Sequence, residues 1–258
     1  MPDSSVNTGL AHPFYEITGG ISPDWVIICD HASNRVPFEV AEGDLGLAPD
    51  DMARHIAYDV GAEGVTRELA RVLHAPAVLS NYSRLVIDPN RGEHDPTLLM
   101  RLYDGTIIPA NRHADETERE RRLELFHRPY HKAIARILAG HPEALLVSIH
   151  SFTPQLKGRD VRPWHVGLLS SDDRRMADPL LEELRRDPEL VVGDNEPYSG
   201  HLPGDTMDRH GVAPGRPHVL IEVRNDLISD PERQRAWGQR LARALTATLS
   251  RFKEIQHG

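Results

Sequence analysis

Residues 25–31 read WVIICDH, a short apolar run that ends in two polar side chains. Its five β-branched, aromatic and small apolar residues are typical of a buried strand. Similar runs at 77–79, 84–88, 144–149, 165–169 and 218–223 predict further strands, and apolar residues at helical spacing predict helices over 50–74, 115–139, 173–186 and 231–252. Pro129 is expected to kink or break the second helix. Strands that alternate with helices predict an α/β fold with a mostly parallel central sheet covered on both faces.

The composition predicts a soluble globular protein with one domain, residues 1–258. The 258 residues show neither an internal repeat nor a low-complexity linker, and 39% of them are hydrophobic. A formal net charge of −9 argues against nucleic acid or a membrane as partner. A single cysteine, Cys29, and an N-terminus without a signal-peptide pattern lead us to expect a cytoplasmic protein.

Polar side chains follow three of the predicted strands. Asp30-His31 follows the first, His150-Ser151 follows the fourth, and Glu222 interrupts the last apolar run shortly before Arg224. Ligands of parallel α/β proteins bind at the carboxyl ends of the strands, so two imidazoles and a carboxylate there predict a metal site with a base beside it. The alternative is structural: hydrogen-bonded core histidines, and a Glu222 paired with Arg224. The pattern alone leaves both open.

The segment SRLVIDPNR, residues 83–91, offers a second polar cluster. Arg84, Asn90 and Arg91 could clamp a substrate carboxylate through paired hydrogen bonds. A surface strand whose arginines pair with nearby acids is the equally weighted alternative.

Other histidines and the cysteine are weaker candidates. His127 and His131 have the spacing of a helical metal pair, but Pro129 lies between them, so a structural or surface role is favoured. His55 and Asp59 share a helix face, where a structural hydrogen bond is the favoured interpretation. Cys29 lies in an apolar run and is expected to be an inert buried thiol. The HExxH, GxSxG, P-loop and GxGxxG patterns are absent, which removes the commoner zincin, serine-hydrolase and nucleotide-binding interpretations.

Five blocks of the sequence, taken together, resemble the N-formylglutamate amidohydrolase family. They run in the family's order over about residues 20–230: DHASNRVP (30–37), HIAYDVGA (55–62), SRLVIDPNR (83–91), HSF (150–152) and IEVRNDL (221–227). The resemblance implies a phosphorylase/hydrolase-like three-layer α/β/α fold, shared with zinc carboxypeptidases and aspartoacylase. It also implies a zinc-type enzyme that hydrolyses N-formyl-L-glutamate, or a similar N-acyl acidic amino acid, to formate and glutamate, a late step of histidine breakdown.

The same resemblance implies roles for individual residues. His31 and His150 would be ligands of Zn²⁺ or another divalent metal, and Glu222 the general base that takes a proton from metal-activated water. Asn90 and Arg91 would bind the substrate carboxylate, with Arg84 as a second anchor, and Arg91 would also stabilise the oxyanion. Arg224 completes the set of substrate-binding candidates, together with a Gly/Pro-rich segment, 193–217, that carries Tyr198, His201 and His210 and is expected to close over the substrate.

One position departs from the pattern of the wider superfamily, in which a glutamate ligand follows the first histidine by three residues. Here that position holds Asn34, a poor ligand for zinc. The third ligand could be Asn34, Asp59, Asp30 or a water. Asn34 also favours a second hypothesis, a non-catalytic protein that binds small carboxylate metabolites at a degenerate metal site. A third, metal-independent hydrolysis by Cys29 or Ser151, predicts indifference to chelators.

Overall fold

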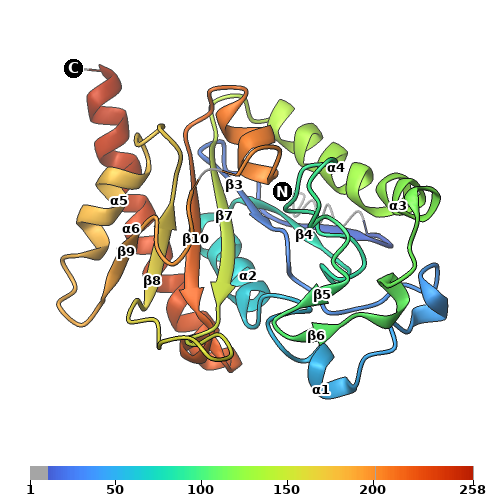
Figure 1. Cartoon of the computed structure of the whole chain (residues 1–258). Helices are drawn as coiled ribbons and strands as arrows, with labels where there is room; N and C mark the ends of the chain where they lie inside the picture. Colours follow the sequence, from blue (N-terminus) through green and yellow to red (C-terminus); the bar gives the residue numbers. More distant parts are fainter. Residues whose placement is uncertain (1–10, 201, 258) are drawn as a thin grey trace.

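A computed structural model describes residues 11–200 and 202–257, and its central element is an eight-stranded sheet (Figure 1). The strand order is β1-β2-β4-β3-β7-β10-β8-β9. The bounds are β1 Ala11–His12, β2 Tyr15–Gly19, β3 Trp25–Cys29, β4 Pro76–Ser80, β7 Leu145–Phe152, β8 Val166–Leu169, β9 Val192–Asp194 and β10 His218–Arg224. The four central strands β4, β3, β7 and β10 are parallel, while β2 and β8 run antiparallel to their neighbours β4 and β10.

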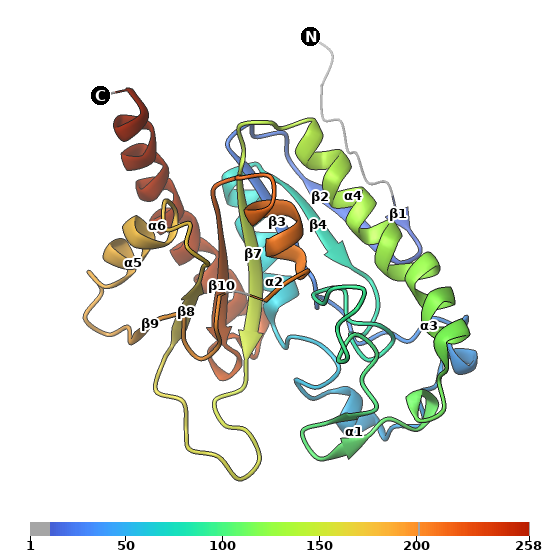
Figure 2. The same ribbon diagram turned by 45° about the horizontal axis from the view of Figure 1, so that its top comes forward.

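Helices cover both faces of this sheet, which gives the three-layer α/β/α fold expected from the sequence (Figure 2). One face packs on α2 (Ala62–Leu73), α5 (Ala177–Leu184) and α6 (Pro231–His257) through residues such as Ile27, Val147 and Ile221. The other face packs on α4 (Arg128–Ala139) through residues such as Ile28 and Leu146. Because side chains alternate along a strand, each central strand is buried on both faces and is almost entirely apolar.

Short elements complete the described part of the chain. A two-stranded hairpin consists of β5 (Leu102–Tyr103) and β6 (Thr106–Ile107). The others are η1 Ala41–Gly43, α1 Pro49–Met52, η2 Pro109–Asn111, α3 Glu116–Arg122, η3 Leu123–His127, η4 Asp208–Val212 and η5 Asn225–Ile228. No helix within residues 11–200 and 202–257 is long and apolar enough to cross a membrane.

Two expected elements differ in the structure. The predicted strand at 84–88 is wrong: these residues are fully buried but pair with no strand. Their apolar side chains fill a separate core cluster, and their backbone folds into turns, with the Val86 amide donating to the Ser83 carbonyl. An apolar run of this length therefore reports burial without specifying a sheet ladder.

The helix expected over 50–74 is interrupted. It divides into α1 and α2, and the turn between them ends at Gly61, whose φ of 82° favours glycine. The Asp59 amide donates to the His31 carbonyl across this turn. The break thereby brings the Asp59 side chain to the end of β3, where a continuous helix could not place it.

The segment 115–139 runs as one uninterrupted helical stretch despite Pro129. It consists of α3, the π-helical segment η3 and α4, with Pro129 in the first turn of α4. A π-helical turn widens the helix by one residue, which accommodates the ring and the missing amide of proline.

Candidate metal and substrate site

Three neighbouring central strands deliver the polar side chains predicted from the sequence to one region. His31 directly follows β3, His150 lies in β7 and Glu222 lies in β10. Glu222 is the register partner of His150. Because β3, β7 and β10 are adjacent and parallel, the three side chains gather at the carboxyl end of the sheet.

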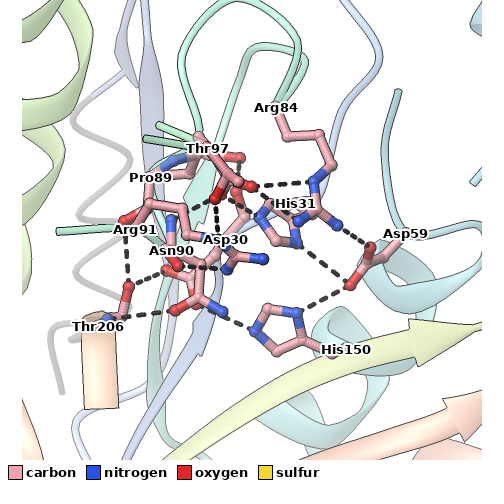
Figure 3. Close-up of polar contacts among 12 residues, drawn as sticks. Asp30, His31, Asp59, Arg84, Pro89, Asn90, Arg91, Thr97, His150 and Thr206 are labelled. Atoms are coloured by element: carbon pink, nitrogen blue, oxygen red, sulfur yellow. Dashed lines mark hydrogen bonds and ion pairs between the residues drawn. The ribbon is translucent and has the colours of Figure 1, made fainter. Parts of the chain in front are cut away.

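His31, Asp59 and His150 form a compact, buried group in which one nitrogen or oxygen of each residue lies within 4.8 Å of the others (Figure 3). The Asp59 Oδ2 atom is 2.8 Å from His150 Nδ1 and 3.4 Å from His31 Nδ1. His31 Nδ1 is buried and makes no hydrogen bond. A buried nitrogen without a partner is costly, so its convergence on a second imidazole and a carboxylate fits a divalent metal with two histidine ligands and one aspartate.

A further carboxylate holds the far side of each imidazole. His31 Nε2 is 2.7 Å from Asp88 Oδ1, and His150 Nε2 is 3.1 Å from Asp30 Oδ2. Each Nε2 thus donates a hydrogen bond outward, which leaves Nδ1 of both rings directed to the space beside Asp59. Such carboxylate–imidazole pairs fix the orientation of metal-binding histidines and raise their basicity.

Hydrogen-bond donors surround Asp30, the carboxylate behind His150. Its Oδ1 accepts hydrogen bonds from the hydroxyls of Thr206 (2.9 Å) and Tyr130 (3.0 Å), and its Oδ2 accepts from Ser148 (3.3 Å) as well as from His150. Asp30 therefore supports His150 from behind and does not face Asp59, so we leave it out of the proposed ligand set.

Electrostatics favour a charged cluster. Burial by itself would lower the pKa of His150, but hydrogen bonds to Asp30 and Asp59 outweigh burial and raise this pKa well above its ordinary value. Burial would raise the pKa of Asp59, but the two histidines lower it strongly. A divalent cation between Asp59 and the imidazoles would take the place of the proton on His150 Nδ1.

Glu222 is a buried carboxyl group beside this cluster. Its side chain is 6% exposed, and its Oε2 atom is buried without a hydrogen-bond partner. Burial raises the pKa of Glu222 to about 7. Arg224 does not pair with it: the Arg224 guanidinium binds Asp226 and the carbonyls of Arg162 and Trp164. The structural alternative, an ion pair between Glu222 and Arg224, is therefore wrong. Arg224 is also not among the residues that line the cavity.

A cavity of about 280 Å³ opens above the cluster. Its walls include His31, Asp59, His150 and Glu222, the candidate substrate residues Arg84, Asn90, Arg91 and Tyr198, and additionally His55, Tyr103, Asp205, Met207, His218 and Leu220. The cavity joins an arginine-rich wall, from the segment after β4, to a wall of β8 and β10 residues. It thus has room for a small molecule that spans the cluster.

The arginine-rich wall is held rigidly. Arg84 is committed to Asp88, to which its Nη2 and Nε donate at 2.7 and 3.1 Å. Arg91 donates from Nη1 to the Asn90 carbonyl and from Nε to Thr97 Oγ1. The Asn90 side-chain oxygen accepts the Thr206 amide. Because Asp88 neutralises Arg84, Arg91 is the better anchor for an incoming carboxylate.

The remaining candidates differ in whether they reach this site. Asn34 is exposed and its amide donates to the Met52 carbonyl, so it does not reach the His31 group. Tyr198 lines the cavity, and its hydroxyl accepts a hydrogen bond from Arg162. His210 is buried outside the cavity wall, and His201 lies outside the described residues.

A row of three buried histidines supports the arginine-rich wall from behind, which confirms the structural role favoured for His127 and His131. His131 Nε2 donates to the Pro89 carbonyl (3.0 Å), His127 Nε2 donates to the Arg91 carbonyl (2.9 Å), and His210 lies 3.0 Å from His131 Nδ1. Burial lowers the pKa of all three, and that of His210 to about 4. Neutral rings therefore fix the backbone on either side of Asn90.

Two further acids belong to the site, and the sequence did not single them out: Asp88 lies in the segment 83–91 and Asp205 in the Gly/Pro-rich segment 193–217. Asp205 lines the cavity, and burial raises its pKa to about 6. Asp205 stands next to no apolar run, so no local signal marks it, whereas Asp88 directly follows the apolar residues 85–87 and could have been noticed there.

Comparisons with known proteins identify the family of this chain. A sequence model of the N-formylglutamate amidohydrolase family matches residues 23–229. The structure is similar to that of a gene product from Agrobacterium tumefaciens (32% identity, TM-score 0.86, covering 93% of this chain and 96% of the other). It shares its fold with N-formylglutamate amidohydrolase from Ralstonia eutropha (21% identity, TM-score 0.68, covering 95% and 99%). No curated protein sequence matches the chain. The chain belongs to the N-formylglutamate amidohydrolase family, whose members have an amidohydrolase-type function.

Proposed function

We propose that this protein is a metal-dependent hydrolase of N-acylated acidic amino acids, with N-formyl-L-glutamate as the reference substrate. One observation carries the proposal: a buried carboxyl group with a free oxygen, Glu222, adjoins two imidazoles and a carboxylate that converge on one point. An arginine-lined wall faces the same cavity. These are the parts that hydrolysis of an amide with a nearby carboxylate requires.

His31, Asp59 and His150 would hold the metal, which we take to be zinc because neutral imidazole suits it. When bound there, a divalent ion supplies Lewis acidity, which lowers the pKa of water and polarises a carbonyl group. Asp88 and Asp30 keep the two rings oriented for that task. Asn34 has no part in this arrangement.

Glu222 would move the protons of the reaction. Its carboxylate can take a proton onto Oε2 from the attacking water and return it to the leaving amine. The Oε2 atom has no other hydrogen-bond partner and is therefore available for both transfers. The buried position of Glu222 excludes bulk water from the exchange.

Arg91 would bind a substrate carboxylate and stabilise negative charge that develops on the carbonyl oxygen. Asn90 and Arg84 would complete the anchor, and the histidine row keeps it in place. Tyr198 is positioned on the opposite wall by Arg162, whose guanidinium lies 4.9 Å from its ring centroid. Residues 193–217 would cover the substrate.

The alternative of a non-catalytic binding protein rested on Asn34 at the position of the expected glutamate ligand. With Asp59 available beside the two histidines, the donor set needs no contribution from Asn34. An unpartnered Glu222 oxygen would moreover be a costly feature in a protein that only binds carboxylates. We therefore favour the hydrolase.

The decisive measurement is formate release from N-formyl-L-glutamate by chelator-stripped protein, with and without added zinc, manganese or cobalt. Turnover restored by metal, and abolished in Glu222→Gln while ligand affinity is kept, is the expected result. Folded protein that shows no turnover with any metal on any N-acyl acidic amino acid would overturn the proposal. Cytoplasmic residence and a role in histidine breakdown stay predictions from the sequence.

A further inference from the structure

The cavity continues past Glu222 into a second arm that the proposed chemistry does not use. Side chains alternate along β10, so His218, Leu220 and Glu222 lie on the same face of the sheet, and all three line the cavity. Four residue steps separate Glu222 from His218, or about 13 Å along the strand. The arm therefore reaches well beneath the carboxyl edge of the sheet, along the face that carries α4 and η4.

The walls of this arm are apolar and come from three segments. Leu220 is the register partner of Leu169 in β8, and Met207 faces them from the start of η4. These three side chains keep exposed fractions of 4–6%, whereas Leu168, Val219 and Ile221 on the opposite face have none. Since all three line the cavity, the residual exposure is apolar surface that a ligand can cover.

His218 closes the arm. Its ring packs against Gly211 of η4, where an added Cβ would come within 2.6 Å of the imidazole. Its Nδ1 donates to the Arg216 carbonyl at 2.8 Å, which fixes the ring. His218 is thus the β10 residue that lines the cavity farthest from Glu222 along the strand.

Strand order decides which part of a substrate enters this arm. The arginine-rich wall follows β4, and the metal-binding group lies between β3 and β7. Leu220 and Leu169 lie on β10 and β8, on the far side of that group. A substrate whose carboxylate is bound by Arg91 and whose carbonyl lies at the His31–His150 group would direct its acyl substituent toward Leu220. A formyl group carries only a hydrogen there and would leave the arm empty.

We propose that the arm lined by Leu169, Met207 and Leu220 is an acyl-chain subsite, and that the preferred substrates are acidic amino acids N-acylated by linear aliphatic chains of several carbons. This inference rests on the proposed hydrolytic function and specifies its substrate class. Each methylene that enters the arm is transferred from water to an apolar surface.

The test is a series of N-acyl-L-glutamates, from formyl and acetyl through butyryl and hexanoyl to decanoyl, assayed with the zinc-loaded protein. We expect kcat/KM to rise about 3- to 4-fold per methylene from acetyl to hexanoyl, on the order of 100-fold in total. The rise should stop once the chain reaches His218, so chains longer than the arm, which extends about 13 Å along the strand, should gain nothing further.

Two variants block the arm from opposite walls. Leu220→Phe and Met207→Phe should each abolish the gain with chain length, measured as the ratio of hexanoyl to acetyl kcat/KM within each variant, because the added ring fills the arm. Val219→Ile adds bulk to the opposite face of the same strand and should leave the chain-length preference unchanged. If Leu220→Phe fails to fold, Met207→Phe, outside the sheet, still provides the test.

Different outcomes separate the inference from the function on which it rests. If formyl-glutamate is hydrolysed best, the acyl subsite is refuted while the hydrolase stands. If N-formyl derivatives of leucine and norleucine gain instead, the arm binds the amino-acid side chain and the assignment is equally refuted. If nothing is hydrolysed, the hydrolase fails. In that case the affinity of the protein for the same acyl series, measured by calorimetry, tests the subsite. An affinity that does not rise with chain length overturns the subsite.

Discussion

Replacing Asp30 by Asn should weaken metal binding without unfolding the protein. Asp30 does not face the metal-binding group, but its Oδ2 atom accepts the Nε2–H of His150 at 3.1 Å. An Asn can keep its oxygen toward His150 and turn its amide to the hydroxyls of Thr206 and Tyr130, which can rotate to accept. The hydrogen-bond network thus survives, while the negative charge behind the imidazole is lost.

The magnitude follows from the role of that charge. Removing a carboxylate partner of a metal-binding histidine typically lowers metal affinity 10- to 100-fold, or about 1.4–2.7 kcal/mol. Asp30 is fully buried, so solvent will not screen the loss and we expect the upper half of this range.

The assay is competition for zinc with a chromogenic chelator, combined with thermal unfolding of the metal-free protein. Ser148→Ala is the matched control: its hydroxyl donates to the same Asp30 oxygen at 3.3 Å but leaves the charge in place. We expect its zinc affinity to change less than about threefold. An Asp30→Asn protein that is folded and binds zinc within twofold of the wild type would refute the argument that this carboxylate positions His150.

Three further outcomes are expected. Zinc affinity should rise on the order of tenfold per pH unit between pH 6 and 7, because the metal displaces a proton from His150, whose pKa is raised. Competition with a chelator at constant ionic strength measures this slope, and zinc affinity that does not change with pH would show that His150 is already neutral. Arg91→Met should raise KM for N-acylglutamates at least 10-fold and lower kcat through the lost oxyanion contact, whereas an unchanged kcat/KM would remove Arg91 from the site. His210, with a pKa lowered to about 4, remains neutral in the folded protein, whereas the same residue in the unfolded chain binds a proton below pH 6.5, so stability falls as pH falls. The free energy of unfolding, measured with urea, should decrease by about 2 kcal/mol from this group between pH 7 and 5, and His210→Asn should show a smaller decrease.

The fold could be predicted from local patterns because each central strand is buried on both faces. Residues 25–29, 145–149 and 218–223 are almost continuously apolar, and a run of that kind is typical of a strand inside a covered parallel sheet. The run at 84–88 contains three consecutive apolar residues and is also buried, yet it forms turns. Apolar content predicts burial in each case, but the hydrogen-bond partners depend on which segments the rest of the chain brings alongside.

The candidate site likewise has one set of residues that local sequence indicates and another set that only the fold brings together. Sequence by itself determined the polar residues that stand at strand ends, His31, His150 and Glu222, because a charged or polar side chain in an apolar run needs a partner or a function. Only the tertiary structure brought Asp59 to the two histidines, through the interrupted helix at Gly61, and placed Asp88 and Asp30 behind them. Those contacts join segments dozens of residues apart, and their distances depend on how β3, β7 and the intervening turns pack, which no local pattern encodes.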